Sequence, residues 1–213
     1  MRLISPSHEF LEEINGEALV KRLERIGRIC YKSEGRITDT SYEKFLSNLL
    51  ARGHESVIEH EKVSVKVVCD RGVSHELVRH RIASYSQEST RYCNYSKDQF
   101  GHELTLIKPC FWKEGSEAYA VWKETMAEVE KNYFRLLDLG ASAQEARSIL
   151  PNSLKTEIVI TMNMREWRHF FKLRTTAAAH PQMREVANAL LLDFQAHIPV
   201  LFDDIVPYVE EKG

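Results

Sequence analysis

Long apolar runs are missing from this sequence, and their absence argues against a membrane helix. No stretch approaches the roughly 18 apolar residues that a spanning helix needs. The first ten residues, MRLISPSHEF, contain no apolar signal-peptide core. Hydrophobic residues make up 43% of the 213 residues and charged residues 28%, which is typical of a globular protein. We therefore expect a cytoplasmic protein in which residues 1–213 form a single domain, with no membrane partner.

Cysteine is scarce, and its spacing suggests neither a disulfide framework nor a metal site. The four cysteines lie far apart and include no CxxC pair. The nine histidines show neither the HExxH pattern nor the spacing of a zinc finger. We therefore expect free thiols at Cys30, Cys69, Cys93 and Cys110, and no metal ion.

An excess of positive charge is also missing. The chain has 29 basic and 31 acidic residues, which gives a formal net charge of −2. Proteins that bind nucleic acid in general carry a basic excess, so this balance counts against a nucleic-acid partner. A local concentration of arginine therefore needs a local explanation.

Apolar residues recur at helical spacing through most of the chain. We expect helices over 16–33, 40–53, 116–139, 142–150, 165–174 and 184–198. The first helix should bury a face that includes Leu19 and Cys30, and the long central one a face that includes Val121 and Trp122. Alternating apolar residues predict strands over 62–69 and 156–163. Helices that alternate with a few strands predict an α/β or α+β domain.

Helix starts have their own sequence signals. Thr40 with Glu43, and Ser142 with Glu145, have the spacing of a capping box, in which each side chain bonds the backbone of the other. Ser74 is the expected N-cap of a further short helix that follows Gly72.

The segment RHRIASYSQESTRY, residues 79–92, concentrates guanidinium groups among serine and threonine hydroxyls. It lacks the alternating Glu and Lys of a solvated surface helix. The planar donor fork of arginine suits a phosphate group. Four further arginines follow in the second half of the chain, and together with the first set they suggest one strongly anionic ligand or two. These four are Arg147, Arg165, Arg168 and Arg174.

Composition alone also allows the arginine cluster roles without catalysis. A charge-rich segment is often simply a solvated face of the protein. The cluster also fits a non-catalytic protein with a basic groove that binds nucleotides or nucleic acid, although no run combines basic and aromatic residues. A histidine phosphatase is disfavoured, because its RHG pattern lies near the chain start, whereas Arg81 replaces the glycine here.

A longer pattern resembles one known family. Arg79-His80-Arg81, seven residues, then Ser89-Thr90-Arg91 is similar to the RHR-x7-S-x-R signature of the flavin-dependent thymidylate synthases. Three further segments resemble elements of the same family, so the resemblance extends over most of the chain. These segments are GHESVIEH, EARSILPNSL and TMNMREWRHFFKLR.

The resemblance implies a fold and an activity. The family fold is a curved, mainly antiparallel sheet flanked by helices, assembled as a homotetramer whose active sites are shared between subunits. The implied enzyme converts dUMP to dTMP by reductive methylation. The one-carbon donor is 5,10-methylenetetrahydrofolate, and FAD reduced by NADPH carries the hydride. Its partners would therefore be these small molecules.

The resemblance also implies roles for individual residues. Arg174 and Ser89 match the positions considered catalytic, Arg174 by polarising uracil and Ser89 first by positioning the substrate. The implied nucleotide-binding residues are Glu76, Leu77, Val78, Arg79, Gln87, Glu88, Ser89, Thr90, Arg91, Arg147 and Arg174. The implied flavin-binding residues are Ser56, Arg79, His80, Arg81, Gln87, Asn163, Met164, Arg165 and His169.

Overall fold

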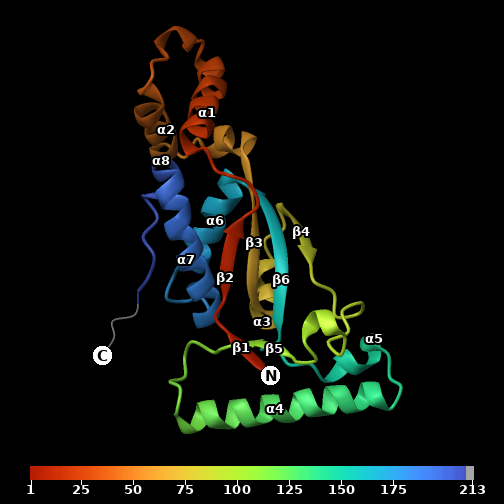
Figure 1. Ribbon diagram of the computed structural model, residues 1–213. Helices are drawn as coiled ribbons and strands as arrows, with labels where there is room; N and C mark the ends of the chain where they lie inside the picture. Colours follow the sequence, from red (N-terminus) through yellow and green to blue (C-terminus); the bar gives the residue numbers. More distant parts are fainter. Residues whose placement is uncertain (210–213) are drawn as a thin grey trace. The chain divides into compact units, whose positions relative to one another are not determined.

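The computed structural model describes residues 1–209 and combines helices with strands (Figure 1). The helices are α1 Gly16–Tyr31, α2 Ser41–Ala51, α3 Arg71–Leu77, α4 Glu117–Asp138, α5 Ala143–Ala146, α6 Met164–Arg174, α7 Pro181–His197 and α8 Pro199–Phe202. The strands are β1 Arg2–Ile4, β2 Ser7–Phe10, β3 Lys62–Asp70, β4 Ala83–Gln87, β5 Thr105–Ile107 and β6 Lys155–Asn163. Short 3-10 turns are η1 Glu34–Arg36, η2 Glu55–His60, η3 Asp98–Phe100 and η4 Arg147–Ile149. Among these helices, none is both long and apolar enough to cross a bilayer.

The strands form one larger and one smaller sheet. The larger sheet has the order β2-β3-β6-β4. The strands β3 and β6 run antiparallel, because Ser64 Oγ lies 2.8 Å from Thr161 Oγ1 and the N–H of Arg71 donates to the carbonyl of Leu154 at 3.1 Å. The prediction of a mixed domain with an antiparallel sheet is confirmed. The smaller sheet is an exception, because β1 and β5 pair in parallel.

The chain divides into two compact units. Unit 1 comprises Met1–His8, Lys66–Arg79 and Tyr85–Val159. Unit 2 comprises Glu9–Val65, His80–Ser84 and the chain from Ile160 onward. The chain therefore passes from unit 1 into unit 2 between Arg79 and His80, within the arginine-rich signature. That residues 1–213 act as a single domain stays a prediction.

The core of unit 1 forms between α4 and β5. One face of α4 buries Tyr119, Trp122, Met126 and Tyr133, and these side chains join a cluster that includes Leu106 on β5. At the start of α4 the hydroxyl of the N-cap residue Ser116 accepts a hydrogen bond from the N–H of Tyr119 in the first turn. The expected burial of Val121 is wrong, because its side chain is 59% exposed on the opposite face.

The core of unit 2 is aromatic and surrounds α6. Trp167, Phe171, Phe194 and Phe202 pack with ring centroids 4.9 to 5.8 Å apart, from α6, α7 and α8. The indole N–H of Trp167 donates to the carbonyl of Val63 at 3.1 Å, so this large side chain is buried with its polar group satisfied. These contacts fix α6, which supplies several of the candidate site residues.

The hairpin of α1 and α2 extends unit 2 (Figure 1). The two helices approach closely at Gly27, where an added Cβ would lie 2.7 Å from the ring of Phe45. Leu19 and Leu23 are buried on the inner face of α1. Cys30 is exposed, contrary to the prediction. The buried face of α1 includes Gly27, and Cys30 in the last turn lies outside this face.

The helix starts confirm one of the two predicted capping boxes. Ser142 and Glu145 form the predicted reciprocal bonds at α5. Thr40 is the N-cap residue of α2 but its side chain makes no capping bond, so this capping box is wrong. The N-cap of α3 is Asp70, whose carboxylate accepts from the N–H of Val73 at 2.6 Å. Ser74 instead lies inside α3 and donates to the carbonyl of Arg71.

Candidate active site

Several of the nucleotide-binding residues implied in unit 1 lie at the end of β4 and in the loop that follows it. Part of the signature, Ala83–Gln87, is a strand, although its many hydroxyls gave no strand signal in the sequence. The amide of Gln87 donates to Ser74 Oγ at 2.9 Å and to Thr156 Oγ1 at 3.2 Å. This side chain is therefore held by α3 and β6 at the point where the strand ends.

The loop after β4 is fixed from both sides. The carboxylate of Glu88 accepts hydrogen bonds from Tyr95 Oη at 3.1 Å and from Lys155 Nζ at 3.0 Å. Burial, together with the charge of Glu88, raises the pKa of Tyr95, which keeps its phenol protonated as a donor. Thr90 is buried, and its hydroxyl lies 3.5 Å from Arg147 Nη1. The arrangement joins the signature loop to the downstream arginine of the same unit.

Two arginines of unit 1 are not neutralised by the protein. Arg79 and Arg91 are exposed, and among residues 1–209 neither forms an ion pair with a carboxylate. The guanidinium of Arg91 lies 5.5 Å from the ring centroid of Tyr92, whose side chain is 77% exposed. Exposed guanidinium groups without an internal partner can form charge-assisted bonds to an anionic ligand.

The flavin-binding residues implied in unit 2 differ in their surroundings. Asn163 caps α6, because its side-chain oxygen accepts from the N–H of Glu166 at 2.9 Å. Met164 is fully buried. Arg165 is exposed and lies 2.6 Å from Glu59. Ser56 is exposed on η2, so it can contact a ligand through its hydroxyl.

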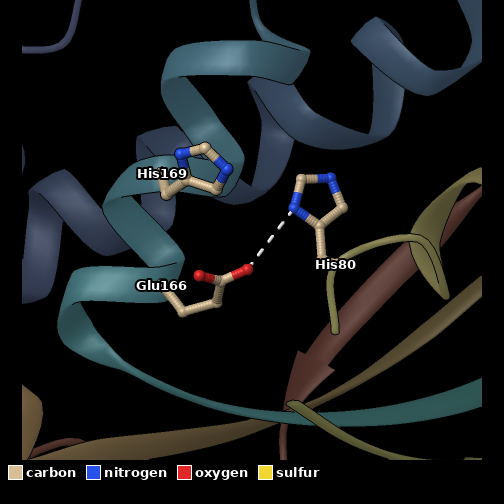
Figure 2. A group of neighbouring side chains, drawn as sticks. All are labelled: His80, Glu166 and His169. Atoms are coloured by element: carbon tan, nitrogen blue, oxygen red, sulfur yellow. Dashed lines mark ion pairs between the residues drawn. The ribbon is translucent and has the colours of Figure 1, made fainter. Parts of the chain in front are cut away.

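His80 is the buried member of the RHR triplet. It is only 5% exposed, and its Nε2 accepts a hydrogen bond from Arg174 Nε at 3.0 Å. On the other side of the ring, Nδ1 lies 3.7 Å from Glu166 Oε1 (Figure 2). Burial lowers the pKa of His80 to about 4, and the electrostatic influence of Arg174 and then of His169 adds to this effect. The imidazole is therefore neutral at physiological pH.

Sequence spacing did not predict the group formed by His80, Glu166 and His169. Their possible ligand atoms all lie within 4.8 Å of one another, which is a spacing that a divalent cation could use. Figure 2 shows Glu166 and His169 on α6 and His80 on the chain that faces the helix. We expected no metal ion because the histidines lack a metal-binding spacing along the sequence. His80 lies far from Glu166 and His169 in sequence, so a search of sequence spacing does not find this group.

Arg168 does not belong to the candidate site, contrary to its grouping with the ligand-binding arginines. Its guanidinium is 2% exposed and bonds both carboxylate oxygens of Asp204, at 2.6 and 2.7 Å, as well as the carbonyl of Leu201. Glu55 lies 3.5 Å away on a third side. Arg168 therefore ties α6 to the segment after α8 and serves the structure of unit 2.

Unit 2 also contains two pockets whose linings differ in charge. The larger has a volume of about 810 Å³, and its wall includes Glu12, Glu13, Glu59 and Glu61 together with Arg22 and Lys62. The smaller, of about 430 Å³, lies in the hairpin of α1 and α2 and has no carboxylate among its lining residues. Its basic residues, which no sequence pattern singled out, are Arg28, Lys32, Arg36 and Arg52.

Comparison with known proteins assigns the family. Residues 16–200 match the family model described as thymidylate synthase complementing protein. The chain belongs to this family. It is 37% identical over 209 residues to the flavin-dependent thymidylate synthase of Pyrococcus furiosus, which covers 98% of this chain and 82% of that protein. The corresponding protein of Pyrococcus abyssi is also 37% identical, over 89% of this chain and 76% of its own length.

Solved structures agree with the family fold. The UMP/dUMP methylase PolB from Streptomyces cacaoi, bound with 5-Br dUMP, superposes with a TM-score of 0.75 and covers 95% of this chain and 96% of that chain. The two sequences are 24% identical, so this likeness concerns the fold. The resemblance to flavin-dependent thymidylate synthases that the signature suggested is confirmed at the level of the family.

The family match adds meaning to a residue that no sequence motif singled out. Glu166 lies inside the matched region, between two residues implied in flavin binding, and it is buried at 7% exposure. A buried carboxylate is unusual without a partner. Its position three residues before His169 and eight before Arg174 places it along the same side of a helix, and this spacing could have drawn attention to it.

Proposed function

We propose that this protein is a flavin-dependent thymidylate synthase that converts dUMP to dTMP. The methylene group of 5,10-methylenetetrahydrofolate is transferred to C5 of the uracil, and a hydride completes the methyl group, so that dTMP and tetrahydrofolate are the products. FAD, when bound and reduced by NADPH, supplies this hydride. The alternative of a non-catalytic basic-groove protein has no support among the relatives, which are named as synthases.

One observation carries the proposal from the family to this chain. The signature arginines Arg79, Arg81 and Arg91 are exposed, and within residues 1–209 no carboxylate of the protein neutralises them. Arginines elsewhere in the chain, such as Arg22 and Arg168, are paired with carboxylates. Exposed guanidinium groups that no carboxylate in the described part of the chain neutralises are suited to an anionic substrate.

The nucleotide is assigned mainly to the residues of the signature loop. The exposed guanidinium groups of Arg79, Arg91 and Arg147 are suited to the phosphate of dUMP. The remaining nucleotide residues are Glu76, Leu77, Val78, Gln87, Glu88, Ser89 and Thr90. Glu88 and Gln87 are already hydrogen-bonded within the protein, so they also stiffen the loop that presents the arginines.

FAD is assigned to polar residues of unit 2 together with Arg79 and Gln87. Ser56, Arg81 and His169 are exposed and can contact the cofactor with their side chains, whereas the buried Met164 would contribute its backbone. Asn163 and Arg165 lie at the start of α6, and the side chain of His80 is buried. Of these residues, Asn163 lines the larger pocket of unit 2.

Arg174 is assigned the activation of uracil. The C5 atom of uracil is a poor nucleophile, and a fixed cation beside the N3 and O4 edge favours the anionic form that attacks the methylene donor. Ser89 is assigned to substrate positioning. Among residues 1–209 its hydroxyl accepts from the N–H of Arg91 and contacts no histidine or carboxylate that could remove its proton.

The assembly and the cellular location of the protein are part of the proposal. We propose a homotetramer with active sites shared between subunits, a curved main sheet, and a cytoplasmic location. The charge balance of the chain supports small-molecule substrates rather than nucleic acid as partners.

The proposed activity is tested on the purified protein. It should take up FAD with the yellow colour of a flavoprotein and oxidise NADPH in a manner that depends on dUMP. In the presence of 5,10-methylenetetrahydrofolate, dUMP should be consumed and dTMP should appear in equal amounts. A colourless protein that binds neither FAD nor dUMP would contradict the proposal.

Cys93→Ala should leave dTMP formation within about twofold of the unsubstituted protein. Burial and the nearby charge of Glu88 raise the pKa of the Cys93 thiol, so it stays protonated and is a weak nucleophile at neutral pH. The measurement is the initial rate of dTMP formation, with circular dichroism to confirm folding. A folded but inactive variant would point to a cysteine nucleophile instead.

A further inference from the structure

One face of α6 carries three groups that meet a single histidine. Glu166, Phe170 and Arg174 follow one another at intervals of four residues, so they line the same side of the helix. His80 lies across them: its Nδ1 is 3.7 Å from Glu166, its ring centroid is 5.0 Å from that of Phe170, and its Nε2 is 3.0 Å from Arg174 Nε. One buried imidazole thus spans two turns of the helix.

The identity of the partners determines where the proton of His80 lies. A guanidinium group can only donate, so Nε2 of His80 must accept with its lone pair. A neutral imidazole with a free lone pair on Nε2 carries its proton on Nδ1. The Nδ1 atom faces the carboxylate of Glu166 at 3.7 Å, beyond hydrogen-bond length, so the attraction between this N–H and the carboxylate is electrostatic (Figure 2). Each contact therefore favours the same tautomer of the ring.

We propose that Glu166 and His80 form a positioning relay for Arg174, in which the carboxylate holds the Nδ1–H tautomer of His80 and the lone pair of Nε2 holds the guanidinium in place. The relay deepens the proposed function, on which it rests, because it gives the uracil-activating cation a fixed orientation. Neither Glu166 nor His80 transfers a proton to the substrate.

The charges around His80 explain why the relay works at neutral pH. The ionisable groups that face the ring include Glu166, His169 and Arg174, which all come from α6. Burial and the two basic neighbours hold the pKa of His80 at about 4. Protonation below that pH would turn Nε2 into a donor that faces another donor, so Arg174 would lose its acceptor.

A divalent cation is the alternative occupant of this group. His80, Glu166 and His169 could supply three ligand atoms. A cation bound at Nδ1 would require His80 to have lone pairs on both ring nitrogens while Arg174 bonds Nε2, and the fixed charge of Arg174 would repel the ion. The contacts therefore favour the proton arrangement over the metal site.

The tautomer can be measured without turnover, by NMR on the folded protein labelled in histidine with carbon-13 and nitrogen-15. The resonance of His80 is identified by its loss in His80→Gln. We expect the Nδ1–H tautomer, with no titration between pH 5.5 and 8. An Nε2–H tautomer, a titration near the ordinary histidine pKa, or stoichiometric binding of added Zn²⁺ that Glu166→Gln abolishes would overturn the relay.

Two further variants test the parts of the relay. Glu166→Gln leaves Arg174 as the remaining contact that favours the Nδ1–H tautomer, so a share of the Nε2–H tautomer should appear; an unchanged spectrum would overturn the role of Glu166. His80→Leu removes the acceptor and should lower kcat about tenfold at saturating FAD, whereas His80→Gln keeps an acceptor oxygen and should restore most of the loss. Equal loss in both variants would overturn the role of His80.

The two kinds of readout separate the relay from the proposed function. If the protein formed no dTMP, the proposed function would fail, but the tautomer of His80 would still report on the relay. If dTMP formed normally and His80 carried its proton on Nε2, the relay alone would fail.

Discussion

Arg174→Ala should lower kcat for dTMP formation by about 100- to 1000-fold, the loss typical when a preorganised charge is removed from a developing anion. The loss should exceed any change in bound FAD, because the proposed partner of Arg174 is the nucleotide. The guanidinium is half-buried and held by His80, so no other side chain of α6 can take its place. The measurement is the rate of dTMP formation at saturating substrates, beside the flavin absorbance.

Lys172→Ala is the matched control for this substitution. Lys172 lies on the same helix two residues earlier, is exposed, and contacts Glu55 at 3.5 Å. Its loss should leave kcat within about twofold, since exposed ion pairs contribute little. Normal methylation of dUMP by Arg174→Ala would remove Arg174 from the active site.

Arg168→Met should destabilise the protein by about 1.5 to 3 kcal/mol, because the charged hydrogen bonds of a buried guanidinium are lost while Asp204, 55% exposed, stays solvated. For a chain of this length, that loss lowers the melting temperature by roughly 5 to 10 °C. Methionine replaces most of the volume, so the effect reports the lost bonds to Asp204 and Leu201 rather than a cavity. Thermal unfolding followed by circular dichroism measures it.

Arg165→Met provides the comparison for Arg168→Met. Arg165 lies three residues earlier on α6, and its side chain is 51% exposed although it also contacts Glu55 and Glu59. Its replacement should change stability by less than about 1 kcal/mol. A drop as small for Arg168→Met would show that the buried pair does not stabilise unit 2.

Local patterns predicted the helices and strands where the periodicity was strong. The alternation of Val63, Val65 and Val67 gave β3, and the capping box of Ser142 with Glu145 gave the start of α5. The strand β4 was missed because Ala83–Gln87 has few apolar side chains to alternate. Its backbone pairing with β6 stabilises it instead, and such pairing is a long-range property.

Capping residues show the same limit on a smaller scale. Ser74 had the right side chain for an N-cap, but Asp70 stands at the end of β3 and reaches the first free N–H of α3. Which residue caps a helix depends on where the preceding strand releases the chain. That point is set by the sheet rather than by the four or five residues around the cap.

The sequence by itself determined the family, because a long spaced signature keeps the chemical groups of a site in a fixed order along the chain. It also determined most helices, because their apolar periodicity is local. Only the tertiary structure separated Arg168, buried against Asp204, from Arg174, held by His80. The physical reason is that the effect of a charged side chain depends on its burial and its partners, and these come from distant parts of the chain.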